Sequence, residues 1–370
     1  MVFRKTRKAK GGKYIGRGSY GCTFRPAVRC KAEKTREKNA ISKVMFAKNA
    51  DSEYKFSPIL MKIDPEQIFT LYPYKICEPQ LDKTNLNYRA YTECNKIISK
   101  DDKKAIFLKD GGADLSNVLD RLPKGKFNKI HRNLFRAFLN LFVGLEHLHK
   151  NDFVHLDIKA GNIVCKITSG HEMRVLGFFP MGKPNYLMKF IDFGFSNIVD
   201  HAFKTNIFFD YLVWPFELRL ASDMYFFGLA ELGVGDLKAY YDHVKQHSQL
   251  HLPYWLINDS AKTPTIDSYK ANHAYIKSLG HQGKLEARRE IITKADVYGL
   301  GLVLADCYYS LTEIRKTGEG VFSAEHPLNV PIYDLVDKMT HPDYRQRITA
   351  KDARVEYERV LLTIEQYFKK

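Results

Sequence analysis

The sequence has few of the features that would place it among fibrous, secreted or membrane proteins. Glycine and proline contribute only 23 and 14 of its 370 residues, which excludes a collagen-like or low-complexity chain. Residues 1–13 contain no apolar core of the kind found in signal peptides. The longest apolar stretch, 297–311, is interrupted by Asp306 and is too short to span a bilayer. We therefore expect a soluble, intracellular protein without a transmembrane segment.

Closely spaced cysteines are also missing. The chain has six, and none forms a CxxC pair: Cys22, Cys30, Cys77, Cys94, Cys165 and Cys307. Zinc ribbons need such pairs, and disulfide scaffolds are typical of short secreted chains. The sequence therefore predicts reduced thiols rather than a disulfide framework.

Acidic residues are outnumbered, with 42 Asp and Glu against 58 Lys and Arg, which gives a net charge of +16. Residues 1–50 contain 15 basic and two acidic residues, and hence 13 of these 16 charges. Such a block can attract nucleic acid, anionic lipid or acidic protein. No zinc spacing or interleaved aromatic residues accompany it, so sequence-specific nucleic-acid binding is not indicated. The simplest interpretation is a solvated basic arm with weak polyanion contact.

A glycine-rich segment, 15–24, contains Gly16, Gly18 and Gly21 at the spacing GxGxxG. Without Cβ atoms, such a loop can bring backbone N–H groups onto phosphate oxygens. A dinucleotide-binding unit would require an apolar strand before it and a helix within it. Lys-rich sequence precedes this segment, and 22–24 followed by Pro26 predicts a strand. We therefore expect a loop between two strands.

A short apolar run, 40–46, predicts a strand that contains Lys43. Burying a lysine is costly unless its charge meets an anion. Glu53 is the candidate partner, in a polar stretch that leads to a helix through Ile59, Leu60 and Ile63. The alternative is that Lys43 points outward and Glu53 is merely exposed.

Two further segments carry acidic residues beside apolar ones. A helix is predicted over 134–149 from apolar residues at three- and four-residue steps. The segment 153–164 follows it and holds His155, Asp157, Lys159 and Asn162 between apolar pairs. Asp157 could accept a proton from a hydroxyl, Lys159 could neutralise a phosphoryl group and Asn162 could bind a divalent cation. A strand ending at Asp192-Phe193-Gly194 would present a second carboxylate to Mg²⁺.

In this order, the glycine-rich loop, the strand lysine, the HxDxKxxN segment and Asp-Phe-Gly resemble the motifs of eukaryotic-type serine/threonine protein kinases. More narrowly, short pieces at 18–22, 41–43, 63–65 and 111–115 are similar to kinases encoded by large nucleocytoplasmic DNA viruses. The resemblance implies a bilobal α+β fold. It comprises a basic arm (1–13), a small β-rich N-lobe with the hinge (14–112) and a larger, mainly helical C-lobe (113–370). ATP would lie between the lobes, and a viral origin would place the protein in host cytoplasm or virions.

The resemblance also implies a reaction: transfer of the γ-phosphoryl group of ATP to Ser/Thr hydroxyls of protein substrates, with Mg²⁺ or Mn²⁺. Lys43 would contact the α- and β-phosphates and Glu53 would hold it, whereas Asp157 would accept the substrate proton. Lys159 would stabilise the γ-phosphoryl group, and Asn162 and Asp192 would bind the metal. The expected nucleotide contacts are Ile15, Gly16, Gly18, Ser19, Tyr20, Gly21, Thr23, Ile41, Lys43, Phe107, Lys109 and Val164.

Further landmarks follow from the same resemblance. Residues 105–108 would form the strand before the hinge, and Ala295 would begin the central C-lobe helix, whose Asp296 supports the Asp157 loop. Arg347 would pair with Glu217, the last residue of Trp-Pro-Phe-Glu at 214–217. This sequence departs from the Ala-Pro-Glu that is usual in the family. Thr205 and Tyr211 are candidate phosphosites, although unmodified loop residues are the simpler interpretation.

One departure from the family lies beside the catalytic position. Leu156 stands where the family has an arginine that pairs with a phosphorylated activation loop, and leucine cannot pair in this way. We therefore expect activity that does not need activation-loop phosphorylation. The alternatives are an idle pseudokinase scaffold and a small-molecule kinase. The retained Lys43, Asp157 and Asp192 argue against the first, and Lys159 against the second.

Two insertions are also predicted. Residues 166–187 should form a hairpin with a protruding loop, and residues 218–290 should include a helix at 224–241. His243 and His247 have the spacing of a zinc-binding pair, but no third ligand is evident, so solvated histidines are the favoured interpretation. The longer insertion would either dock a partner or pack on the C-lobe.

Overall fold

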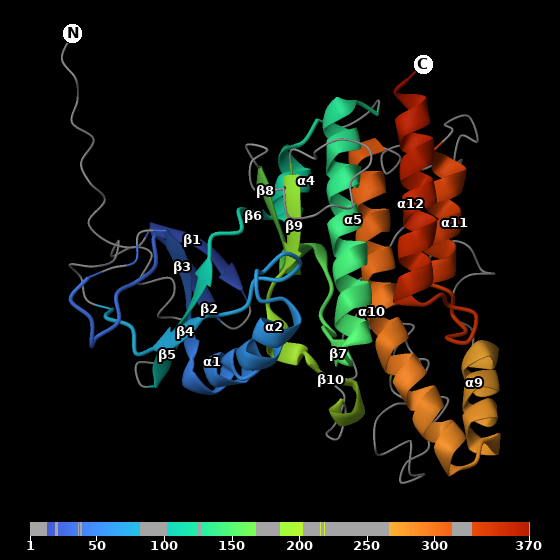
Figure 1. Ribbon diagram of the computed structural model, residues 1–370, viewed down its shortest axis with the longest axis horizontal. Coiled ribbons are helices and arrows are strands. Elements are labelled where there is room, and N and C mark those ends of the chain that lie inside the picture. Colours follow the sequence, from blue (N-terminus) through green and yellow to red (C-terminus); the bar gives the residue numbers. More distant parts are fainter. Residues whose placement is uncertain are drawn as a thin grey trace. The chain divides into compact units, whose positions relative to one another are not determined.

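The computed structural model describes residues 13–18, 21–35, 37, 39–81, 102–123, 127–167, 186–202, 215, 218, 266–312 and 328–369. Their architecture is α+β: an antiparallel five-stranded sheet is followed by a mainly helical C-terminal part (Figure 1). The chain divides into two compact units. Unit 1 comprises residues 1–111 and 191–194, and unit 2 comprises residues 112–190 and 195–370. The short segment Ile191–Gly194 therefore belongs to the same unit as the sheet, although it is far from the sheet strands in sequence.

Unit 1 is built on a sheet with the strand order β1-β2-β3-β5-β4. The strands are β1 (Lys13–Gly18), β2 (Gly21–Arg25), β3 (Ala40–Phe46), β4 (Lys75–Cys77) and β5 (Lys103–Lys109). All neighbours are antiparallel, and Lys43 of β3 is opposite Ile106 of β5. The strands predicted at 22–24, 40–46 and 105–108 are confirmed.

The two faces of this sheet have separate apolar cores. Because side chains alternate along a strand, Ala40 and Val44 contribute to one core and Met45 to the other. Helix α1 (Ala47–Tyr54) follows β3 directly and buries Ala50 in the second core. Lys43 has the same parity as Met45, so its side chain lies on the α1 face. Helix α2 (Ser57–Ile63) follows and confirms the helix predicted there.

A disulfide joins Cys30, in the connection between β2 and β3, to Cys77 at the end of β4, with Cα atoms 5.9 Å apart. The expectation of reduced thiols is therefore wrong for this pair. The two cysteines are 47 residues apart, and a backbone bridge between Cys30 and Pro79 brings their segments together. Sequence spacing could not show this pairing, because it depends on where the β2–β3 connection crosses the sheet.

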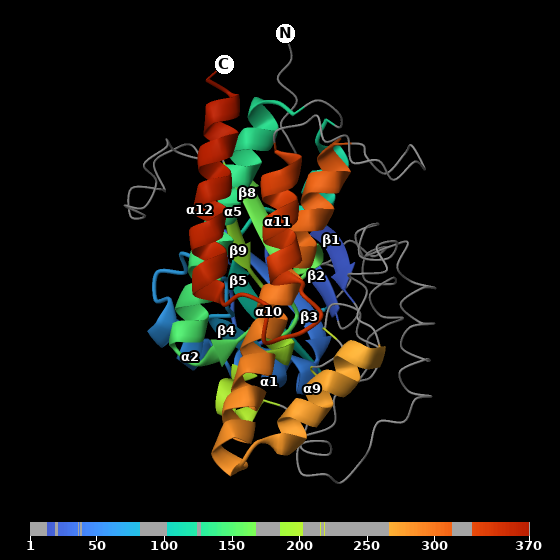
Figure 2. The same ribbon diagram turned by 90° about the vertical axis from the view of Figure 1, so that its right-hand side faces the viewer.

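The described part of unit 2 contains two small sheets, β6-β8-β9 and β7-β10 (Figure 1), and a set of long helices (Figure 2). Its strands are β6 (Ala113–Asp114), β7 (Phe153–Val154), β8 (Ile163–Ile167), β9 (Tyr186–Phe190) and β10 (Asn197–Ile198). Its helices are α4 (Leu115–Arg121), α5 (Lys129–Lys150), α9 (Ile266–Ser278), α10 (His281–Thr312), α11 (Asn329–Met339) and α12 (Ala350–Tyr367). Short 3₁₀ turns lie at Ala160–Asn162, Phe193–Phe195 and Val199–His201.

The predicted helix at 134–149 is the central part of α5, which begins at Lys129 because Asn128 and His131 form a capping box there. Helix α5 packs against α12, and α10 packs against α11. β8 and β9 are antiparallel, as the hairpin prediction requires, although residues 168–185 lie outside the described part. None of the helices in the described ranges has the length and apolar character that a membrane crossing needs.

The predicted start of the central helix is wrong. α10 begins at His281 rather than at Ala295, so the helix extends well into the predicted insertion, and α9 occupies another part of it. Glycines at 283, 299 and 301 and polar residues in its first half obscured this in the sequence. Several predicted features lie outside the described residues: residues 1–12, Ser19, Tyr20, Cys94, Thr205, Tyr211, Trp214, Glu217, the helix at 224–241, His243 and His247.

Candidate active site

Lys43 is the centre of a charged cluster in unit 1. Its Nζ lies 2.9 Å from Oε2 of Glu53 and 2.8 Å from Oδ2 of Asp192. The side chain of Lys43 is 15% exposed and that of Glu53 4%. Three segments therefore meet here: β3, α1 and the residues that follow β9. The predicted pairing of Lys43 with Glu53 is observed.

The position of Glu53 differs from the prediction in one respect. We expected it in a polar stretch before a helix, but it lies in the last turn of α1. Ala47, Ala50 and Glu53 are three residues apart and share the buried face of this helix. The alternative of an exposed Glu53 is therefore wrong.

Burial and charge act in opposite directions on this cluster. Burial raises the pKa of Glu53, and the charge of Lys43 only partly offsets it, so that the pKa is about 7. Burial alone would lower the pKa of Lys43, but the charges of Asp192 and Glu53 outweigh it and raise the pKa above its ordinary value. Lys43 therefore stays cationic, and two carboxylates compete for it.

The glycine-rich segment connects two antiparallel strands, as predicted, with Gly18 opposite Gly21. Gly21 is needed by the fold, because a Cβ there would lie 2.6 Å from the carbonyl oxygen of Val44. Gly16 is different: among the residues that the structure describes, no atom would lie within 4 Å of a Cβ at this position. The open space at Gly16 would suit a ligand that approaches the backbone.

The remaining predicted nucleotide contacts of unit 1 have contrasting environments. Ile15 is 43% exposed, whereas Thr23 and Ile41 are partly buried. Phe107 is buried in the sheet, and its carbonyl oxygen accepts a hydrogen bond from the amide of Tyr74 at 3.0 Å. One lone pair of that oxygen is thus already used. Lys109 is the last residue of β5, and its side chain is exposed.

A second polar cluster lies in unit 2, on the loop between β7 and β8. Lys159 Nζ is 2.9 Å from Oδ1 of Asp157, and Nδ2 of Asn162 donates to Oδ2 of Asp157 at 2.7 Å. Asn162 also donates to the carbonyl oxygen of Asp157 at 3.0 Å. The three predicted residues are therefore held together, and Asp157 and Asn162 are buried. Val164 is buried nearby in β8, paired with Asp114 and Lys189.

Asp296 of α10 binds the backbone of this loop, as expected. Its carboxylate accepts from the backbone amides of His155 and Leu156, each at 2.7 Å. Leu156 has a positive φ of 59°, a conformation that a leucine rarely adopts and that these bonds help to stabilise. Two residues that the sequence did not single out also contact this site. His149 Nε2 lies 3.2 Å from the same carboxylate, and Ser196 donates to the carbonyl oxygen of His155. The only indication of His149 in the sequence was the group of histidines at the end of the predicted helix.

Arg347 is buried and donates to the carbonyl oxygens of His341 and Lys294. Its guanidinium also lies over the ring of Tyr298. Its predicted partner, Glu217, lies outside the described residues.

The donor groups fit the expected ligands. In unit 1, Lys43 and the backbone at Gly16 suit phosphate oxygens, and the Asp192 carboxylate is an oxygen ligand of the kind that Mg²⁺ prefers. In unit 2, the side-chain amide of Asn162 carries an oxygen of the same kind. Within the described ranges, no group of three or more His, Cys, Asp or Glu side chains could hold a metal ion. A Mg²⁺ ion bound mainly by phosphates and water needs no such group.

Comparison with protein-family models found no match. A search of curated protein sequences likewise found no significant match.

Proposed function

We propose that this protein is a serine/threonine protein kinase with a bilobal kinase-like fold, which transfers the γ-phosphoryl group of ATP to protein hydroxyls with Mg²⁺. The observation that carries this proposal is the Lys43 ammonium between Glu53 and Asp192. A sheet core gains nothing from a buried cation with two carboxylates, because desolvating all three is costly. A site that binds polyphosphate and a divalent cation does need them.

The Asp157 cluster supplies the groups for the transfer itself. The Asp157 carboxylate can accept the proton of a substrate hydroxyl, and Asn162 and Lys159 fix its orientation. Lys159 also brings a positive charge to the place where the phosphoryl group would carry negative charge. ATP would supply the phosphoryl group, and Mg²⁺ held by Asn162 and Asp192 would neutralise its charge.

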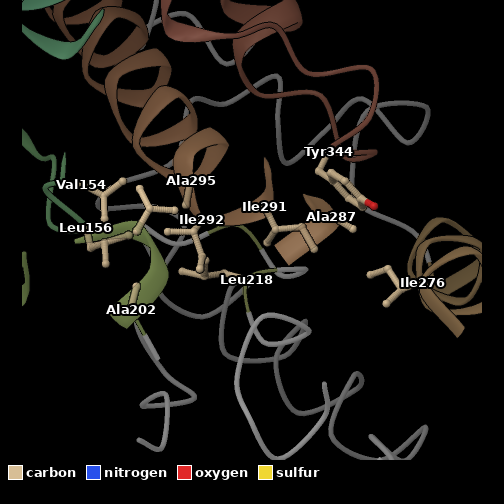
Figure 3. Close-up of a cluster of buried hydrophobic side chains, with 11 residues drawn as sticks. Val154, Leu156, Ala202, Leu218, Ile276, Ala287, Ile291, Ile292, Ala295 and Tyr344 are labelled. Carbon is tan, nitrogen blue, oxygen red and sulfur yellow. The ribbon is translucent and has the colours of Figure 1, made fainter. Parts of the chain in front are cut away.

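We also propose that the kinase needs no phosphorylation of its activation segment. Leu156 is 4% exposed and lies in an apolar cluster that includes Val154, Ala202 and Ile292 (Figure 3). A leucine has no donor for a phosphate, and its surroundings favour an apolar side chain. Treatment with a phosphatase should leave the activity unchanged, and a large loss would contradict this part of the proposal.

The first test is incubation of the purified protein with Mg²⁺, γ-labelled ATP and a generic basic protein substrate, beside Asp157→Asn. Removing the proton acceptor should lower the rate by about 10²–10⁴. Asp120→Asn, an exposed acidic residue of α4, is the matched control and should retain full activity.

Three results are informative. Label on Ser or Thr from the wild type and the Asp120 variant, but not from Asp157→Asn, would support the proposal. ATP binding without transfer in any variant would indicate an idle scaffold instead. Absence of ATP binding would contradict the assignment of Lys43 and its partners.

A further inference from the structure

One face of α10 contacts both ends of the short segment that carries the Asp157 loop. Asp296 binds the amides of His155 and Leu156 at the end of this segment. Arg289 lies seven residues earlier, about two helical turns away and hence on the same face. Its Nη2 contacts the carboxylate of Asp152, directly before β7. α10 therefore holds residues 152–156 at two points.

The same arginine reaches a second segment. Arg289 Nη1 donates to Oδ1 of Asp200 at 2.9 Å, in the 3₁₀ turn that follows β10. β10 pairs with β7, and the amide of Val199 donates to the carbonyl oxygen of Asp152 at 2.8 Å. Arg289 thus bridges the residue before β7 and a residue after β10, across the two-stranded sheet.

The neighbouring arginine adds a contact to the second segment. Arg288 Nη2 donates to the carbonyl oxygen of Ala202 at 2.9 Å. Beneath these polar contacts, Val199 and Ala202 pack with Leu156 and with Ile292 of α10. The segment 197–202 is therefore fastened to α10 by two arginines and by apolar contacts, none of which requires a modified residue.

We propose that Arg289 is a positioning residue that fixes the Asp157 loop and the segment 197–202 relative to α10. This inference rests on the proposed kinase function. Arg289 does not touch the reacting groups and acts through Asp152, β7 and the Asp296-bound turn that leads to Asp157. It supplies constitutively the ordering that a phosphorylated side chain would otherwise provide.

The exposure of the three side chains determines how large the effect should be. Arg289 is 40% exposed, Asp152 52% and Asp200 70%. Exposed ion pairs contribute little to global stability, so the loss of Arg289 should act locally. A positioning role for Arg289 predicts an effect confined to the segments that it contacts, whereas a role in overall folding would affect the whole unit.

The test combines amide hydrogen exchange with kinetics on the full-length protein. In Arg289→Ala, exchange across 197–202 should increase about fivefold, while exchange in α12 stays unchanged. The kcat for the protein substrate should also fall about fivefold with an unchanged KM for ATP, because Lys43 and its partners are not involved. Arg289→Lys should restore part of both effects, and Arg359→Ala, an exposed arginine of α12, should show neither.

The outcomes separate the two proposals. Unchanged exchange at 197–202, or exchange that increases equally in α12, would overturn the positioning role. So would an increase at 197–202 with full kcat in an active enzyme. A wild type that binds ATP but transfers no phosphoryl group would instead overturn the proposed function, and the positioning role with it.

Discussion

The backbone amide of Leu156 donates a hydrogen bond to Oδ1 of Asp296 at 2.7 Å, although 140 residues separate the two in the chain. The other oxygen of this carboxylate accepts from the amide of His155. A carboxylate can accept at both oxygens, which an asparagine side chain cannot do. The left-handed conformation of Leu156 therefore depends on a charged residue buried in α10.

Asp296→Asn should lower the free energy of unfolding by about 1–3 kcal/mol, because one buried amide loses its acceptor and faces an NH₂ group. Urea denaturation followed by circular dichroism measures this change. Asp120→Asn is again the control and should unfold like the wild type. Equal midpoints for the wild type and Asp296→Asn would show that the turn does not need the carboxylate.

Leu156→Ala should lower the free energy of unfolding by about 2–4 kcal/mol, because it leaves a cavity in the apolar cluster between β7 and α10. Leu156→Arg should be more damaging, since it buries a charge where the described neighbours are apolar. Leu362→Ala, on an exposed leucine of α12, provides the comparison. A fully stable Leu156→Arg would mean that an arginine fits this position and would weaken the argument for phosphorylation-independent activity.

His131 should make stability depend on pH. Its Nδ1 faces the amide of Asn128 and its Nε2 the carbonyl oxygen of Pro123, as a neutral ring would. Burial lowers its pKa below the ordinary value of 6.5, and the bond to Pro123 only partly offsets this. The stabilisation is thus present above pH 6.5 and is lost as the pH falls through the lowered pKa.

The measurement is the free energy of unfolding of wild type and His131→Gln between about pH 7.5 and pH 5.5, one unit on either side of the ordinary pKa of 6.5. The wild type should lose more stability over this range than the variant. His281→Gln, at an exposed histidine, should follow the wild type. Parallel curves for wild type and His131→Gln would contradict the lowered pKa.

Thiol labelling should distinguish the disulfide from the free cysteines. Burial raises the pKa of Cys165 to about 12 and that of Cys307 well above its ordinary value, so both should react slowly at pH 8 (roughly the ordinary thiol pKa). Cys30 and Cys77 should become reactive only after reduction. Labelling of Cys30 and Cys77 without reductant would restore the original expectation of reduced thiols.

Replacing the pair should also destabilise unit 1. With a sequence separation of 47 residues between the two cysteines, the double variant Cys30→Ser/Cys77→Ser should lose about 3–4 kcal/mol under non-reducing conditions. With reductant present for both proteins, the wild type and the variant should become equally stable. A wild type that is equally stable with and without reductant would show that the bond contributes nothing.

Local patterns in the sequence were sufficient for several parts of the structure. Apolar residues at helical spacing predicted α5, and the short apolar run 40–46 predicted β3, the strand that contains Lys43. The sequence was also sufficient to predict that Asp157, Lys159 and Asn162 lie close together, because all three fall within one short loop. These features depend on interactions between near neighbours, which the sequence displays directly.

The features that join distant segments depend on tertiary packing, which local sequence patterns do not display. Glu53 and Asp192 converge on Lys43 because α1 and the residues after β9 meet at one face of the sheet. The Cys30–Cys77 bond depends on where a connection crosses that sheet, and the early start of α10 depends on its packing. Arg289 appeared in the sequence as one arginine among many, since nothing in a sequence shows that two turns of one helix will face both ends of the same loop.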